Sequence, residues 1–271
     1  MIVGKKLIYS IEEAEGTVMK KIKGNEPIKI HIFTGYTMMI FSLMLSLAFN
    51  NIMLNSFNYL NAISAGNVSG KRAEVFNEKA NPVPLRQDMS ISSKIIAYLK
   101  PGEEITLLEG RKNWFYVETI DGKKGFIDNR YVKTNYLPPI NFNGDFKDRI
   151  VLSQSKQRLF IIRNNRVEKE FIISSGLDDT PTPNGLFVIE PGRRGSWFYS
   201  EKYKQGGKYW VGFRGNYLFH SIPMDRNQNI IAEELQKIGQ PASHGCIRML
   251  VEDAEWFYKN IPDGMPVIIR P

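Results

Sequence analysis

Cysteine and histidine are scarce in this sequence. Its 271 residues include one cysteine, Cys246, and three histidines, His31, His220 and His244. A single thiol excludes an intrachain disulfide framework and any cysteine-rich zinc site. Internal repeats and low-complexity tracts are also absent, and with 42% hydrophobic and 24% charged residues the composition is close to a globular average. Intrinsic disorder, collagen and coiled coil are therefore excluded for the chain as a whole.

Acidic residues are outnumbered by basic ones. The chain has 36 Lys and Arg against 28 Asp and Glu, which gives a net charge of +8 at pH 7. Such a balance suits an anionic partner, whether nucleic acid, an acidic polymer or a membrane surface. Because no single basic run dominates, nucleic acid has no advantage over the other two, and we expect no nucleic-acid partner.

Charge is missing altogether from residues 30–70, which contain no Asp, Glu, Lys or Arg. The apolar part, residues 32–54, is 23 residues long, and about 20 helical residues cross the hydrocarbon core of a membrane. Lysines on its N-terminal side predict that residues 1–31 are cytoplasmic and that everything after about residue 55 lies outside. These lysines are Lys5, Lys6, Lys20, Lys21, Lys23 and Lys29.

Two other interpretations of this segment stay open. A cleaved signal peptide needs a small-residue cleavage site, and Ile63-Ser64-Ala65 is a passable one, although it lies well past the apolar core. A buried helix of a globular domain would seldom combine so long a charge-free run with such unequal flanks. We therefore expect a single-pass protein of the cell membrane whose remaining chain is extracellular.

Residues 72–134 are predicted to form a small β-barrel. Aromatic and β-branched residues predict strands at 105–108, 114–117 and 125–127, and Asp121-Gly122 marks a hairpin turn. The order of features is Pro84-Leu85-Arg86, Ile95 to Glu103, Trp114-Phe115-Tyr116-Val117, Gly125-Phe126-Ile127 and Tyr131-Val132. This order resembles a bacterial SH3-like (SH3b) domain. Members of that family commonly bind cell-wall peptides or position a neighbouring enzyme; a spacer without a ligand is the alternative.

The residues from 149 onward are predicted to form a second domain that is mainly β. Two short helices are expected, at Ile230–Ile238, where Gly239 and Pro241 supply the stop signal, and at Glu252–Asn260. Strands are expected at 150–152, 158–162, 171–173, 185–189, 217–220 and 266–269.

Cys246 is the residue with the clearest chemical potential. An unpaired thiol in an exported protein is a free reactive group or forms an intermolecular disulfide, and it needs a base to become a nucleophile. His31 lies at the membrane entrance, which leaves His220 and His244. On a strand, His244 and Cys246 would share one face. His220 ends a separate strand that pairing can bring closer, so we expect His220 to be the base and His244 to shape or polarise the site.

Other interpretations of these residues stay open. The backbone N–H groups around Gly245 and Cys246 suit an oxyanion hole, because no Cβ intrudes at Gly245. A lone cysteine is, however, usually a small buried hydrophobe, and a lone histidine is usually structural. Zinc would need a further protein ligand that is not obvious nearby, so we expect neither a metal nor a cofactor. The spacing alone indicates a candidate cysteine enzyme.

Three motifs then follow one another in the second domain. They are Thr180 to Phe187 (TPTPNGLF), Phe219 to Pro223 (FHSIP) and Ser243 to Met249 (SHGCIRM), with Glu252-Asp253-Ala254 and Trp256 after them. In these motifs residues 149–270 resemble the L,D-transpeptidase catalytic domain, also called the YkuD domain. The third motif is the specific one, and the order of all three makes chance an unsatisfactory explanation.

The resemblance implies a cysteine-dependent acyltransferase of peptidoglycan biosynthesis, and so of cell-wall organisation and cell shape. Cys246 would attack the carbonyl of the third residue, a diamino acid, in a tetrapeptide stem. D-Ala would leave, and a neighbouring stem's side-chain amine would take the acyl group in a 3→3 cross-link. His220 would accept and return the proton. The supporting positions carried over are Ser221, whose carbonyl would orient His220, and His244, Gly245 and Arg248.

Several alternatives remain. Arg248 would face a substrate carboxylate or form a structural ion pair. His220 and His244 are 24 residues apart, more than in shorter members of the family, and the extra helix at 230–238 would be part of a lid or an inert insertion. The same site with water as acceptor would be an L,D-carboxypeptidase, and a non-catalytic wall-binding protein is a third candidate. A papain-like endopeptidase is disfavoured because its nucleophile usually precedes its histidine.

The predicted fold class is mainly β with minor α. The expected partners are peptidoglycan stem peptides, the cell wall through the SH3b-like domain and the membrane through the N-terminal helix. The predicted order is a cytoplasmic basic tail (1–31), a transmembrane signal-anchor (32–54), a linker (55–71), an SH3b-like domain (72–134), a connector (135–148) and an L,D-transpeptidase catalytic domain (149–271) on the cell-wall side.

Overall fold

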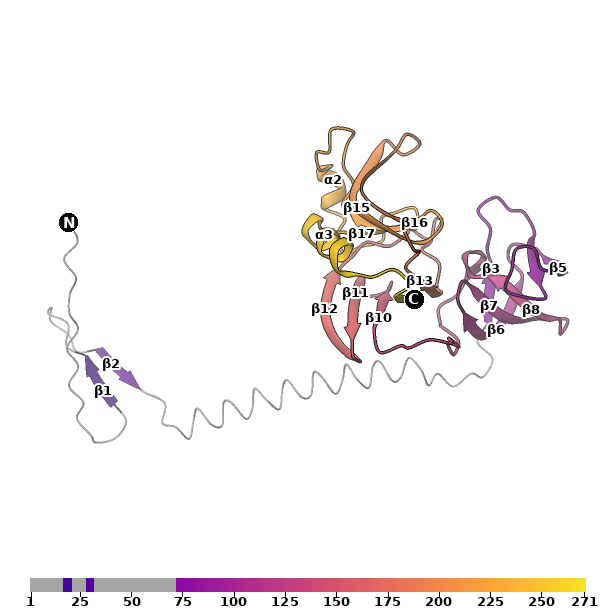
Figure 1. Ribbon diagram of the computed structural model, residues 1–271, viewed down its shortest axis with the longest axis horizontal. Coiled ribbons are helices and arrows are strands. Elements are labelled where there is room, and N and C mark those ends of the chain that lie inside the picture. The colour runs from indigo at the N-terminus through magenta and orange to yellow at the C-terminus, as the bar shows by residue number, and fades with distance from the viewer. Residues whose placement is uncertain (1–16, 21–27, 32–71) are drawn as a thin grey trace. The chain divides into compact units, whose positions relative to one another are not determined.

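The computed structural model describes residues 17–20, 28–31 and 72–271 (Figure 1). The predicted membrane span, residues 32–54, and the linker, residues 55–71, lie outside these described residues. Two short strands of the expected cytoplasmic tail, β1 (Thr17–Lys20) and β2 (Ile28–His31), pair antiparallel. Within the described ranges no helix is both long and apolar enough to cross a membrane. The membrane anchor therefore stays a prediction.

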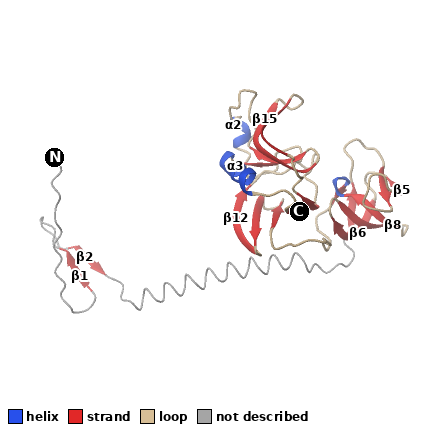
Figure 2. Cartoon of the chain, in the orientation of Figure 1, coloured by secondary structure: helices blue, strands red, loops and turns tan. Residues whose placement is uncertain are grey.

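The chain from residue 72 onward is mainly β, as predicted, and Figure 2 shows how few helices accompany its strands. The first seven strands form one sheet in the order β5-β4-β8-β7-β6-β3-β9. Alternate side chains of these strands point inward and bury Leu107, Phe115, Val117 and Ile127 completely. The strands are β3 (Arg72–Val75), β4 (Val83–Arg86), β5 (Ile95–Leu99), β6 (Glu104–Arg111), β7 (Trp114–Thr119), β8 (Lys124–Asp128) and β9 (Val132–Lys133).

The hairpin predicted at Asp121-Gly122 joins β7 to β8. Gly122 has φ +80° and donates its N–H to the Thr119 carbonyl, so the turn closes with the backbone that glycine adopts easily. A single 3-10 turn, Asn129–Tyr131, follows β8 and is capped by the Asp128 side chain.

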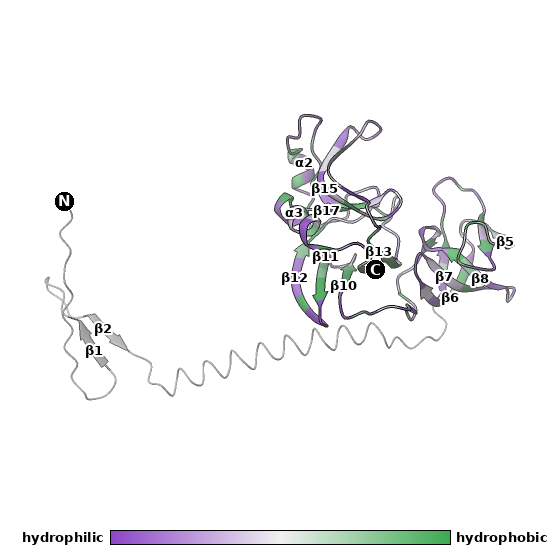
Figure 3. Ribbon diagram, in the orientation of Figure 1, coloured by the Kyte–Doolittle hydropathy of each residue, from purple (hydrophilic) through white to green (hydrophobic). Residues whose placement is uncertain are grey.

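The rest of the chain forms two sheets around one core. The first sheet has the order β12-β11-β10-β18-β13 and the second has the order β14-β15-β16-β17. Figure 3 shows hydrophobic residues concentrated on β10 and β11, near the middle of the first sheet. The strands are β10 (Arg149–Ser153), β11 (Arg158–Arg163), β12 (Arg166–Ile172), β13 (Gly185–Val188), β14 (Arg194–Ser200), β15 (Gln205–Arg214), β16 (Tyr217–Ser221), β17 (Ile247–Met249) and β18 (Pro266–Arg270).

Aromatic contacts join the two sheets and the second helix. Phe187 of β13 meets Phe213 of β15 edge-on, with ring centroids 5.4 Å apart. Phe219 of β16 packs on Phe257 of α3 (Val251–Asn260) at 4.6 Å. The helix predicted at Glu252–Asn260 is therefore confirmed, one residue longer, and its apolar face covers β16 from the core side.

The other predicted helix is much shorter than expected. Only Ala232–Leu235 forms an α-helix, α2, and the chain then continues in turns to Gly239, whose φ is +91°. Neither predicted end is the observed one. The expected start, Ile230, lies in a β-bridge with Met224, and the helix ends at Leu235 with Gln236 as its C-cap, four residues before Gly239.

Three strands of the second sheet, β14, β15 and β17, were not predicted. Glycines interrupt the apolar pattern of β15. A tertiary contact with β16 requires one of them. A Cβ at Gly207 would lie 2.7 Å from Nδ1 of His220, so the strand crosses the histidine ring at a distance that no other residue allows.

Candidate active site

The candidate site lies where β16 and β17 run parallel. Their register pairs Phe219 with Ile247 and His220 with Arg248. Phe219 and Ile247 face the core, so the alternation of strand side chains turns His220 and Arg248 to the other face. Cys246 directly precedes β17 and continues this alternation. All three line one cavity of about 560 Å³, together with Phe198, Tyr203, Trp210, Leu218 and His244.

His220 is held as a neutral base. The side chain is buried, with 5% of its surface exposed, and its ring meets Phe198 edge-on at 5.1 Å. Nδ1 lies 2.6 Å from the Ser221 carbonyl oxygen, which only accepts hydrogen bonds, so Nδ1 carries the proton and Nε2 the lone pair. Burial and then the charge of Arg248 lower the pKa of His220 to about 3, against the effect of the Ser221 carbonyl. Near neutral pH the imidazole is therefore unprotonated, with a free lone pair on Nε2.

Cys246 is half-buried and rests as a thiol. Its Sγ donates a hydrogen bond to the Asn216 carbonyl oxygen at 3.4 Å. Desolvation raises the pKa of the thiol, and the Leu218 backbone N–H and the charge of Arg248 only partly oppose it. Cys246 is thus a neutral thiol that shares its cavity with a neutral imidazole. It needs a general base to become a nucleophile.

The loop before Cys246 is held from within. Gly245 has φ +103°, and a Cβ there would lie 2.5 Å from the Tyr217 ring, so only glycine fits. Its N–H donates to Ser243 Oγ at 3.0 Å, and that hydroxyl donates to the Cys246 carbonyl at 2.5 Å. Of the two candidate donors for an oxyanion hole, the Gly245 N–H is thus engaged in the loop, which leaves the N–H of Cys246.

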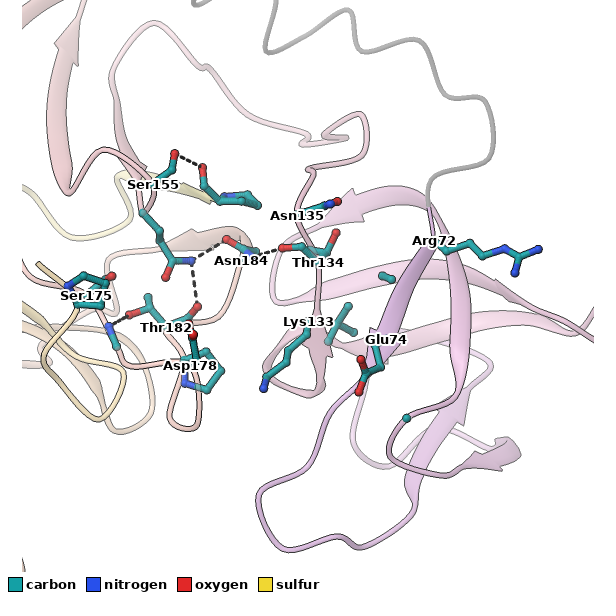
Figure 4. A pocket seen from close by; sticks show the side chains of 18 of the residues that line it. Arg72, Glu74, Lys133, Thr134, Asn135, Ser155, Ser175, Asp178, Thr182 and Asn184 are labelled. Atoms are coloured by element: carbon teal, nitrogen blue, oxygen red, sulfur yellow. Dashed lines mark hydrogen bonds between the residues drawn. The ribbon is translucent and has the colours of Figure 1, made fainter.

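Thr182 is a positioning residue that was not among the predicted site residues. Its Oγ1 accepts from the Gly176 N–H and donates to the Gly245 carbonyl, both at 2.9 Å. The signal for it was the motif at 180–187, whose physical purpose only the folded chain reveals. Thr182 also lines a second cavity, of about 890 Å³, that Figure 4 shows between Thr182 and Asn184 on one side and Lys133 on the other.

Arg248 forms the structural ion pair that was one of its two interpretations. Its Nη1 lies 2.5 Å from Glu234 Oε2 on α2 and donates to the Ala242 carbonyl at 2.9 Å. The segment around α2, which was expected to be part of a lid or an inert insertion, is therefore tied to the cavity wall. Arg248 still lines the cavity, and its buried Nε has no hydrogen-bond partner among the described residues.

Of the remaining predicted residues, His244 lines the cavity, whereas Ser221 is fully buried and is not part of the lining. His244 sits in a bend before β17 rather than on a strand, and its exposed ring stacks on Tyr203 at 4.3 Å. The Ser221 hydroxyl accepts from the Lys208 N–H and donates to the Ile222 carbonyl, both at 2.9 Å. These bonds fix the peptide that orients His220. Among the described residues, no three His, Cys, Asp or Glu side chains are grouped so that they would hold a metal ion.

Two family models match the chain. Residues 147–269 match the model of the L,D-transpeptidase catalytic domain (YkuD), and residues 81–133 match that of the bacterial SH3 domain. Both matched ranges fall within the segments that carried the corresponding resemblances, apart from residues 147 and 148, which precede the predicted start of the second domain.

Individual proteins match part of the chain. A candidate L,D-transpeptidase of Bacillus subtilis (strain 168), YciB, is 44% identical over 125 residues, which are 44% of this chain and 64% of that protein. A second candidate of that organism, YqjB, is 24% identical over 126 residues, 44% of this chain and 69% of that protein. The crystal structure of an L,D-transpeptidase from Stackebrandtia nassauensis aligns with 20% identity and a TM-score of 0.39, over 48% of this chain and 60% of that one. The chain thus spans less than two thirds of the first relative.

Proposed function

We propose that this chain, which carries an L,D-transpeptidase catalytic domain at residues 147–269 and a bacterial SH3 domain at residues 81–133, forms 3→3 cross-links in peptidoglycan through an acyl-enzyme on Cys246. One observation carries the proposal. The only thiol of the chain lines one cavity with a buried imidazole whose tautomer is set by the Ser221 carbonyl.

The first half of the proposed reaction forms a thioester. Nε2 of His220 takes the proton of Cys246 while Sγ bonds to the carbonyl carbon of the stem's third residue. The resulting oxyanion is stabilised by the N–H of Cys246. As the tetrahedral intermediate collapses, the C–N bond to D-Ala breaks, and His220 returns its proton to the leaving amine.

The second half transfers the acyl group. The side-chain amine of a neighbouring stem attacks the thioester and gives a proton to His220. The C–S bond then breaks, and the thiolate recovers that proton. In both halves Nε2 of the neutral His220 takes the proton, and the hydrogen bond from Nδ1–H to the Ser221 carbonyl stabilises the imidazolium that forms in between.

The other residues are proposed to support this chemistry. Ser221 orients the base, Gly245 and the loop around it set the position of the thiol, and His244 with its Tyr203 partner forms part of the cavity rim. The Arg248 charge favours the thiolate but is shared with Glu234, so we assign Arg248 to holding the cavity wall rather than to binding the substrate carboxylate.

Location and wall binding are part of the same proposal. Residues 32–54 would anchor the chain in the membrane with residues 1–31 in the cytoplasm, on the strength of the charge-free run and its lysine-rich flank. The SH3 domain would bind the cell wall. The order of segments proposed from the sequence, including a connector at 135–148, suits an enzyme that acts on the wall outside the membrane.

The test uses the purified full chain and a disaccharide-tetrapeptide, with products identified by mass spectrometry. A dimer of two stems that lacks one D-Ala, formed by the wild type and absent with Cys246→Ala, is the expected result. Tripeptide without dimer would replace transpeptidation by L,D-carboxypeptidase activity. Unchanged tetrapeptide across several stem types would refute the enzyme and leave a wall-binding protein.

A further inference from the structure

The SH3 domain contributes a buried carboxylate to the catalytic domain. Asp128, at the end of β8, is 5% exposed. It accepts hydrogen bonds from Arg130 of its own domain, at 2.7 Å from Nη2 and 3.0 Å from Nε, and it also forms an ion pair with Arg214 at the end of β15. One carboxylate therefore pairs with a guanidinium from each domain.

Arg214 begins the turn that contacts the thiol of Cys246. Gly215 and Asn216 connect β15 to β16, and the Asn216 carbonyl accepts the hydrogen bond of Cys246 Sγ at 3.4 Å. Arg214 is also the cross-strand partner of Tyr217, whose ring lies against Gly245. Asn216 in this turn and Tyr217 directly after it thus contact the residues that hold the nucleophile.

We propose that the SH3 domain is a positioning element of the catalytic site, and that Asp128 acts through Arg214 to hold the turn at residues 214–217 against Cys246. Asp128 touches neither substrate nor thiol and is a positioning residue. Its effect on turnover rests on the proposed function; its effect on the thiol does not.

The physical reason is the cost of leaving Arg214 alone. Its side chain is 19% exposed, and its Nε is buried without a hydrogen-bond partner among the described residues. Without the Asp128 carboxylate, a mostly desolvated guanidinium loses its counter-charge and moves toward solvent. The turn moves with it, because Arg214 is part of the β15–β16 pairing, and the Asn216 carbonyl no longer faces the thiol.

Docking of the two domains does not depend on this pair alone. The Asn113 N–H donates to the Leu186 carbonyl at 2.8 Å, and Lys112 forms a parallel bridge with Leu186. Asn184 Nδ2 donates to the Thr134 carbonyl at 3.1 Å. A change at Asp128 therefore acts on the turn while these other contacts keep the domains together.

The test compares Asp128→Asn and Arg214→Gln with the wild-type full chain. The first readout is the rate of Cys246 alkylation by iodoacetamide against pH. A carbonyl acceptor favours the thiol over the thiolate, so its loss is expected to move the midpoint of the profile to lower pH. The charged or titratable groups around the thiol are unchanged in every variant: Tyr217 and the cavity-lining Arg193, Lys202, Tyr203, His220, His244 and Arg248.

The second readout is turnover of the tetrapeptide stem. A misplaced nucleophile is expected to lower kcat about tenfold. KM should stay within about twofold, because the parts of the cavity that bind the stem are not changed. The kcat of the double variant should fall no further than that of either single variant, since both substitutions break the same contact. Asp121→Asn is the matched control, because Asp121 pairs with Lys123 on the exposed surface of the same domain.

Two results would overturn the proposal. One is an unchanged alkylation profile and kcat in both variants with only a lower thermal midpoint, which would make the pair a structural contact. The other is an equal shift with Asp121→Asn. If the wild type does not cross-link any stem, the alkylation profile still decides, so the proposed function and this inference fail separately.

Discussion

The Nδ1 of His220 donates to the carbonyl oxygen of Ser221, the next residue along β16, across 2.6 Å. A carbonyl cannot donate in return, so this contact selects one tautomer and leaves Nε2 as the basic nitrogen. The same contact would stabilise the imidazolium during a reaction. In the proposed mechanism this backbone carbonyl would take the place that a carboxylate holds in many triads, without adding a second charge to a buried site.

The buried imidazole makes stability depend on pH. The pKa of His220 is lowered from 6.5 to about 3, chiefly by burial, so between these values the unfolded chain binds a proton that the folded chain does not. Stability is expected to fall as pH drops below about 6.5, by about 1.4 kcal/mol per pH unit from this residue. Urea unfolding at several pH values measures it. His220→Asn should flatten this part of the curve, whereas the exposed His244→Asn should not.

Gly245→Ala should lower both the free energy of unfolding and the activity. The substitution forces alanine to φ +103° and places its Cβ 2.5 Å from the Tyr217 ring, which we expect to cost about 3 kcal/mol. Gly264→Ala is the matched control, since Gly264 has φ +80° with nothing within 4 Å of the new Cβ, and the left-handed backbone alone should cost about 1–2 kcal/mol. Equal losses in urea unfolding would show that the Tyr217 contact has no energetic weight.

Glu234→Gln should destabilise the chain far more than Lys237→Ala. Glu234 pairs with both cations, but Arg248 is buried and Lys237 is half exposed. Removing the carboxylate charge leaves Arg248 unpaired in the cavity wall, at about 3 kcal/mol. Removing Lys237 breaks a surface pair worth less than about 1 kcal/mol. Chemical denaturation of both variants measures the difference between their free energies of unfolding. Similar values would contradict the idea that burial makes the Glu234–Arg248 pair the stronger of the two.

Thr182→Val keeps the shape of the side chain and removes its hydroxyl. The Gly176 N–H and the Gly245 carbonyl then lose a buried partner, at about 1–3 kcal/mol. Because Gly245 adjoins Cys246, the rate of thiol alkylation should change as well. Thr180→Val serves as control: its hydroxyl contacts the Ser243 carbonyl at 3.3 Å in a more exposed position, so both effects should be small. An unaltered Thr182→Val variant would show that the two hydrogen bonds of Thr182 contribute nothing to stability or to the position of the thiol.

Much of the site could be predicted because its chemistry is rare in the sequence. With one cysteine and three histidines in the chain, Cys246 and His220 are conspicuous from composition and spacing alone. The helix at 251–260 was also predictable, since its apolar residues recur at helical spacing. The strand β15 could not be predicted, because Gly207 is required by its close approach to the ring of His220 and fits no local sequence pattern.

The sequence by itself determined which groups are available for chemistry: one thiol and a histidine near the end of a strand, with a glycine between His244 and Cys246. Only the tertiary structure decided how they are held. The Glu234–Arg248 pair, the Thr182 bridge to Gly245 and the Asp128–Arg214 pair join residues that are 14, 63 and 86 positions apart. Their energies come from burial and from partners brought together by folding, and such partners leave no periodic signal along a chain.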